Sequence, residues 1–254
     1  MHPKATFGSL LLKIFFMVFF WILLFFGGRN STLMLIVLPL STVVLLYFWH
    51  ERLEVIRMIA LTIVAPALEI LATSPPFEIY SYASQELVTI PYWLPFAWSF
   101  FTLVTFRFID DFISILDLEK GALFLLENKG QLLFIEIIVL ALYAAVVLFS
   151  WEITGEINTA LLLFELAFVN LILCFVYNRK ADIIILPICI ISAMLSEYAG
   201  ITGKVWEYAA SDLWGMPLCV PFAYPFMMFI FNRFALDIDA IIGERDGARR
   251  QEIA

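Results

Sequence analysis

The stretch YSYASQELVTIPYWLPFAWSFFTLVTFRF, residues 80–108, recurs in altered form as WEYAASDLWGMPLCVPFAYPFMMFIFNRF, residues 206–234. At a constant offset of 126 residues, ten of the 29 positions are identical, where composition alone would give about two or three. Upstream the offset becomes 128 residues, and it pairs Glu69 with Glu197. This pattern predicts two copies of one unit. A duplicated membrane protein tends to place its site where the copies meet.

The composition indicates that lipid is the solvent of this chain. Of its 254 residues 63% are hydrophobic and 15% are charged, and the mean hydropathy is +0.96. A soluble domain of this size cannot bury so much apolar side chain. A helix needs about 20 apolar residues to cross the hydrocarbon core. Eight stretches approach that length: 9–27, 33–49, 55–73, 91–106, 131–151, 158–177, 182–199 and 217–235.

The predicted fold is therefore an all-α polytopic membrane protein with eight transmembrane helices, arranged as two parallel four-helix repeats. An even number of helices per copy makes both copies insert the same way up. We divide the chain into a first repeat (1–108), a cytoplasmic amphipathic linker (109–130), a second repeat (131–236) and a charged cytoplasmic tail (237–254).

Positive charge predicts the orientation of these helices. In this topology thirteen of the fifteen lysines and arginines lie on the side of both termini, and only Arg29 and Lys204 lie on the other side. Because lysine and arginine are retained in the cytoplasm, both termini are expected there. We therefore expect a multi-pass protein of the cell or inner membrane.

Two acids recur at the same position of the predicted repeat. Glu69 and Glu197 each lie about one turn from the outer end of an apolar helix, where a charged group is costly and normally has a partner. In one interpretation the two carboxyl groups converge and transfer protons or bind an ion. In the other, each carboxylate ties down the loop of its own copy by accepting backbone N–H bonds. Glu165, deep in the sixth helix and opposite Val37, is the third candidate catalytic residue.

The loops 74–90 and 200–216 are too aromatic to lie free in water, so we expect them to fold back over the helices. Their aromatic residues, with two at the start of the following helices, are either interfacial anchors or a surface for an apolar ligand. These candidate binding residues are Tyr80, Tyr82, Trp98, Trp206, Tyr208 and Tyr224.

Several classes of function are disfavoured by the residues present. The three cysteines, Cys174, Cys189 and Cys219, lack metal-site spacing, and the chain has two histidines, so we expect no metal. The sequence contains no nucleotide-binding loop and no H-E-x-x-H motif, and we expect no cofactor and no nucleic-acid partner. The expected partner is a membrane lipid or an apolar small molecule, and the oligomeric state stays open.

The segment from Glu197 to Tyr208, EYAGITGKVWEY, followed by Gly215-Met-Pro217, resembles the repeated segment of small carotenoid-pathway membrane proteins. These are the lycopene cyclase domain proteins and the related carotenoid hydratase family. The resemblance covers about 25 residues and is degenerate in the first copy. The cyclases carry two acids just after Gly-x-Pro, where this chain has Leu218 and Cys219. The resemblance implies a related fold and an apolar substrate, and it does not transfer cyclase activity.

Two functions follow as expectations. The first is an enzyme that acts on an isoprenoid-like or carotenoid-like lipid by acid-assisted chemistry at the interface of the repeats. The second is a non-catalytic subunit that binds or carries a lipid, or that serves in assembly.

Overall fold

A computed structural model describes residues 6–49, 51–75, 78–116, 137, 138, 141, 180–209, 211, 213–225, 234–236 and 238–243. This part of the chain is predominantly helical. Its named elements are α1 (Phe7–Gly27), α2 (Ser31–Phe48), α3 (Arg52–Thr73), β1 (Tyr80–Tyr82), α4 (Leu94–Ile115), α7 (Lys180–Thr202) and β2 (Trp206–Tyr208).

Three of the described helices, α1, α2 and α3, are long and apolar enough to cross a membrane. Their outward faces carry large exposed apolar side chains such as Phe15, Ile36 and Ile63, each more than half exposed. Water does not favour such surfaces on three adjacent helices. The helices are therefore compatible with an integral membrane protein. The predicted number of eight spans and their arrangement as two repeats stay predictions.

Local sequence signals explain where the helices begin. Thr6 and Ser9 form a capping box at the start of α1, which satisfies backbone N–H groups that have no partner inside the helix. The Asn30 side chain accepts a hydrogen bond from the Leu33 backbone at the start of α2. Pro95 occupies the first turn of α4, where its missing N–H has no cost.

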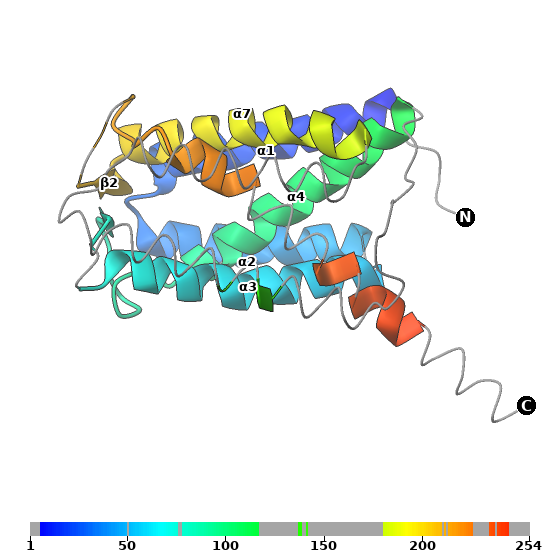
Figure 1. Cartoon of the computed structure of the whole chain (residues 1–254). Coiled ribbons are helices and arrows are strands. Elements are labelled where there is room, and N and C mark those ends of the chain that lie inside the picture. The colour runs from blue at the N-terminus through cyan, green and yellow to red at the C-terminus, as the bar shows by residue number, and fades with distance from the viewer. Residues whose placement is uncertain are drawn as a thin grey trace, which may run out of the picture.

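Helix α4 is the centre of the described bundle. It crosses between α1 and α7 on one side and α2 and α3 on the other (Figure 1). Hydropathy predicts that this helix ends near residue 106, but α4 continues to Ile115. The extension is stabilised because Ile109 and Ile113 remain buried, while Asp111 pairs with Lys13 of α1. The first seven residues of the predicted linker thus continue α4.

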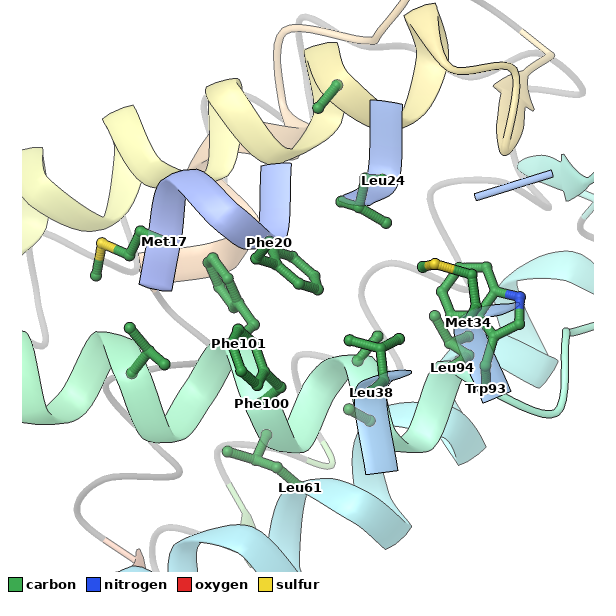
Figure 2. Packing of buried hydrophobic residues seen from close by; sticks show 14 of the residues in the cluster. Met17, Phe20, Leu24, Met34, Leu38, Leu61, Trp93, Leu94, Phe100 and Phe101 are labelled. Atoms are coloured by element: carbon green, nitrogen blue, oxygen red, sulfur yellow. The ribbon is translucent and has the colours of Figure 1, made fainter. Parts of the chain in front are cut away.

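Aromatic and aliphatic side chains fill the space around α4. Phe20 of α1 stacks on Phe100 of α4, with ring centroids 5.8 Å apart, and its centroid lies 5.6 Å from that of the Phe101 ring. Figure 2 shows these rings together with Leu38 of α2 and Leu61 of α3. Burying rings of this size supplies most of the packing energy at such a contact.

A two-stranded antiparallel sheet joins the two aromatic loops. β1 pairs with β2 in the register Tyr80 with Tyr208, Ser81 with Glu207 and Tyr82 with Trp206. The sequence predicts loops that fold back over the helices, but it does not predict that they pair as a sheet. The pairing brings together segments more than 120 residues apart.

A turn with the same closing hydrogen bonds follows each strand, and the two turns lie 126 residues apart in the sequence. The turns Leu87–Ile90 and Leu213–Met216 are each closed by two reciprocal backbone hydrogen bonds of 2.8–3.0 Å. Val88 and Trp214 occupy equivalent places in these turns, with positive φ angles of 60° and 53°. Non-glycine residues are uncommon in this conformation. The two turns therefore share their closing hydrogen bonds and the conformation of their second residue, but they differ at the third, where Gly215 has a φ of 84° and Thr89 has no positive φ.

An ionic cluster lies at the end of α3 and α4 that is opposite the sheet. Arg57 contacts Glu54 at 2.8 Å and Asp110 at 3.0 Å. Arg107 contacts Glu51 at 2.8 Å and Glu54 at 3.2 Å. Glu54 and Arg57 are almost fully buried. These five residues, which we call the ionic cluster, hold the start of α3 against the second half of α4.

Candidate functional site

Glu69 lies near the end of α3 and is the hydrogen-bond acceptor for three aromatic side chains. The hydroxyl groups of Tyr80 and Tyr82 donate to Oε2, the latter at 3.0 Å. The indole nitrogen Nε1 of Trp98 donates to Oε1 at 3.1 Å. The carboxyl group therefore links three separate elements: α3, β1 and the first turns of α4.

Glu197 lies near the end of α7 and has the same arrangement. Trp206 Nε1 donates to Oε2 at 2.8 Å, and the Tyr208 hydroxyl donates to the same oxygen at 2.9 Å. The Tyr224 hydroxyl donates to Oε1 at 2.5 Å. As at Glu69, one oxygen binds the two strand residues and the other binds a residue of the following helix.

The two sets of donors correspond at the offset of 126 residues. Tyr82 matches Tyr208, while the other two positions exchange tyrosine and tryptophan, since Tyr80 matches Trp206 and Trp98 matches Tyr224. Each carboxyl group thus has two tyrosines and one tryptophan. Donor type differs at two of the three positions, but the number of donors and their division between the two oxygens are retained.

The donors of one glutamate contact the donors of the other. The rings of Trp98 and Tyr224 stack with centroids 5.6 Å apart and an interplanar angle of 27°. Tyr80 meets Tyr208 at 5.1 Å and Tyr82 meets Trp206 at 5.8 Å across the sheet. We call these six residues, with Glu69 and Glu197, the aromatic cluster. The two carboxyl groups lie in one cluster and are separated by their own donors.

The phenols of the two strands act as donors. Burial, followed by the nearby carboxyl groups, raises the pKa of Tyr82 and of Tyr208 well above the usual range. These hydroxyl groups therefore keep their protons at neutral pH and donate hydrogen bonds to the glutamates.

Gly200 makes room for Trp206. A Cβ atom at this position would lie 2.1 Å from the Trp206 ring, much closer than van der Waals contact allows. The last turn of α7 therefore requires glycine where the indole crosses it. In this position the Trp206 nitrogen donates to Glu197, which lies one turn before Gly200 on α7.

The structure brings together eight of the nine residues that the sequence singles out. In one interpretation of the sequence the glutamates accept hydrogen bonds from backbone N–H groups. The donors observed are aromatic side chains. Trp98 and Tyr224, considered as anchors or ligand surfaces, are hydrogen-bond donors to the carboxyl groups. Glu165, the ninth, lies outside the described residues. The offset alignment already contains the signal for the donors, because all six occupy matched positions.

No metal-binding group of three or more histidine, cysteine, aspartate or glutamate residues occurs in the described ranges. Comparison with protein-family models, with curated proteins and with solved structures gives no significant match.

Proposed function

We propose that this chain is a multi-pass membrane protein that acts on an isoprenoid-like lipid by acid-assisted chemistry at the interface of two four-helix repeats. Glu69 and Glu197 are the proton-transfer groups. The observation that carries the proposal is that two carboxyl groups at matched positions lie in one aromatic cluster formed by both halves of the chain. The resemblance to the lycopene cyclase domain and carotenoid hydratase proteins supports the same substrate class.

The chemistry requires a proton donor and stabilisation of a cation. A protonated glutamate gives its proton to a carbon–carbon double bond, so that one carbon gains a C–H bond and its neighbour becomes a cation. Tyrosine and tryptophan faces attract cations, and the carboxylate that remains lies nearby. Loss of a proton from the cation, or addition of water, completes the reaction and returns a proton to the carboxylate.

A second candidate function is non-catalytic lipid binding, carriage or assembly. One observation favours it: the polar groups of the six aromatic side chains are occupied by the glutamates, and the rings contact one another. Such a cluster holds the ends of α3 and α7 together, and this role requires no catalytic activity. The two functions differ in whether the glutamates must carry a proton.

Expression of the wild-type protein in a carotenoid-producing host tests the enzymatic function. We expect chromatography of the extracted pigments to show a new species, which disappears when Glu69 or Glu197 is replaced. The control is Glu207→Gln, because Glu207 is exposed on β2 between two members of the aromatic cluster. An unchanged pigment profile with folded, inserted protein would favour the non-catalytic function.

The proposed topology has its own test. Reporter fusions after residues 80 and 210 are expected to report the outside of the membrane, and a fusion at residue 254 is expected to report the cytoplasm. The thirteen-to-two charge asymmetry is the physical reason. A cytoplasmic signal from either loop fusion would contradict two copies of four helices with the same orientation.

A further inference from the structure

Two buried hydroxyl groups on α4 have no hydrogen-bond partner within the described part of the chain. They belong to Thr102 and Thr105, and both residues are fully buried. An unpaired buried hydroxyl is destabilising, whereas valine has nearly the same shape without that cost. The two threonines are therefore placed to gain free energy from any group that pairs with them.

Five other buried or partly buried serines and threonines of the described helices are paired within their own helix. Each of these five donates a hydrogen bond to the carbonyl oxygen four residues earlier, the usual solution in apolar surroundings. These bonds are Thr42 to Leu38, Thr62 to Met58, Thr73 to Glu69, Ser99 to Pro95 and Ser196 to Ser192, all 2.7–2.9 Å long. Thr102 and Thr105 depart from this pattern, as does Ser192 of α7, but only the two threonines lie together on one helix face.

The position of the two threonines connects them with the aromatic cluster. They follow Trp98 at four and seven residues, so the three side chains share one face of α4. Trp98 bonds to Glu69 and stacks on Tyr224, which places this face at the contact between the two halves of the chain. At 1.5 Å per residue, Thr102 lies about 6 Å and Thr105 about 10 Å from the level of Trp98 along the helix.

Only the first half of the sequence carries these hydroxyl groups. At the offset of 126 residues the matching positions are Met228 and Phe231, which are apolar. The glutamates and their donors are matched in both halves, but the hydroxyl groups are not. This asymmetry is the kind that orients a ligand with one polar group and a long apolar chain.

We propose that Thr102 and Thr105 form a hydroxyl subsite that binds an oxygen-bearing group of the lipid. The inference rests on the proposed function, and it narrows the substrate class to an isoprenoid with a hydroxyl or carbonyl group. That group lies about 6–10 Å along α4 from the level of Trp98, which binds Glu69. A hydrocarbon of the same length leaves both hydroxyl groups unpaired and binds less tightly.

Binding of two matched lipids tests the subsite without any assay of activity. The probes are geranylgeraniol and the same chain with hydrogen in place of the hydroxyl group, presented to the purified full-length protein in nanodiscs. Native mass spectrometry measures the apparent Kd of each. We expect the wild type to prefer the alcohol about fivefold to tenfold, the ratio that one or two buried hydrogen bonds produce.

The variant T102V/T105V is expected to bring this ratio close to one while it still binds the hydrocarbon. The variant T102S/T105S keeps the hydroxyl groups and should keep the preference. Thr42→Val, on α2 and bonded within its own helix, is the matched control and should behave as the wild type. Because valine and threonine are alike in shape, folding is not expected to change.

The outcomes separate this inference from the function on which it rests. Equal binding of both lipids by the wild type, or an undiminished preference in T102V/T105V, would overturn the subsite and leave the lipid function standing. If neither lipid binds, both proposals are wrong. A loss of preference in the valine variant that the serine variant does not show supports the subsite.

Discussion

Replacing Glu69 or Glu197 with glutamine is expected to abolish product formation in the carotenoid-producing host, with a change in unfolding free energy below about 1 kcal/mol. Glutamine retains the size of the side chain and its hydrogen-bonding capacity but has no ionisable proton. Pigment chromatography measures the first effect, and denaturant titration in detergent micelles measures the second. The double replacement is expected to be no worse than either single one, since residues that act as a unit lose their function together.

The geometry explains why glutamine fits. At Glu69 the amide oxygen can face the Trp98 nitrogen, while the amide NH₂ faces the tyrosine hydroxyls, which also accept hydrogen bonds. At Glu197 the oxygen faces Trp206 and Tyr208, and the NH₂ group faces Tyr224. Each of the six side chains therefore keeps a hydrogen-bond contact, although Tyr80, Tyr82 and Tyr224 change from donor to acceptor.

Alanine at either position is expected to destabilise the protein by about 2–4 kcal/mol, because three buried donors lose their acceptor together. If glutamine variants keep full activity while alanine variants unfold readily, the glutamates are structural and the enzymatic function is wrong. Glu207→Gln should change neither quantity, because the Glu207 side chain is exposed on β2. The two kinds of substitution thus separate a protonic role from a structural one.

The side chains that donate hydrogen bonds to Glu69 and Glu197 can be predicted only in part from the sequence. The offset pairs Tyr82 with Tyr208 by identity, and it also aligns Tyr80 with Trp206 and Trp98 with Tyr224. The last two pairs look like ordinary divergence in sequence. In the structure they are compensating exchanges, since an indole N–H and a phenol O–H both donate to a carboxylate. Chemical equivalence of this kind is visible only when the acceptor is known.

The sheet and the end of α4 could not be predicted for different reasons. Strands of three residues carry too little periodicity to be recognised, and the pairing of β1 with β2 joins segments far apart in the chain. Hydropathy ends α4 near residue 106, before Arg107 and the two acids that follow it. It does not register that Asp110 and Asp111 have cationic partners on α3 and α1, which remove the cost of continuing the helix.

The charge pattern places Arg57 and Arg107 on the same side of the membrane, and the structure brings both into the ionic cluster. A buried ion pair contributes little net stability over apolar residues of the same size, but removal of one partner leaves a buried charge uncompensated. The cluster therefore specifies how α3 meets α4. Its contribution to the unfolding free energy is therefore measured by removing one of its charged residues.

Arg57→Ala is expected to lower the unfolding free energy by about 3–5 kcal/mol. The substitution removes the contacts of Arg57 with Glu54 and Asp110 and its position 4.7 Å from the Phe106 ring centroid. Glu54 is 1% exposed and retains Arg107 as its cationic contact in the cluster. Unfolding in detergent micelles gives the change directly, and the aromatic cluster at the far end of α3 should stay intact.

Arg52→Ala on the same helix is the matched control. The Arg52 side chain is 45% exposed where it pairs with Asp239, and exposed pairs contribute about 0–1 kcal/mol. In a double-mutant cycle, Glu54→Gln combined with Arg57→Ala should cost less than the sum of the single changes, because the neutral amide no longer needs the cation. Equal effects of Arg57→Ala and Arg52→Ala, or strict additivity in the cycle, would show that the buried cluster does not hold α3 against α4.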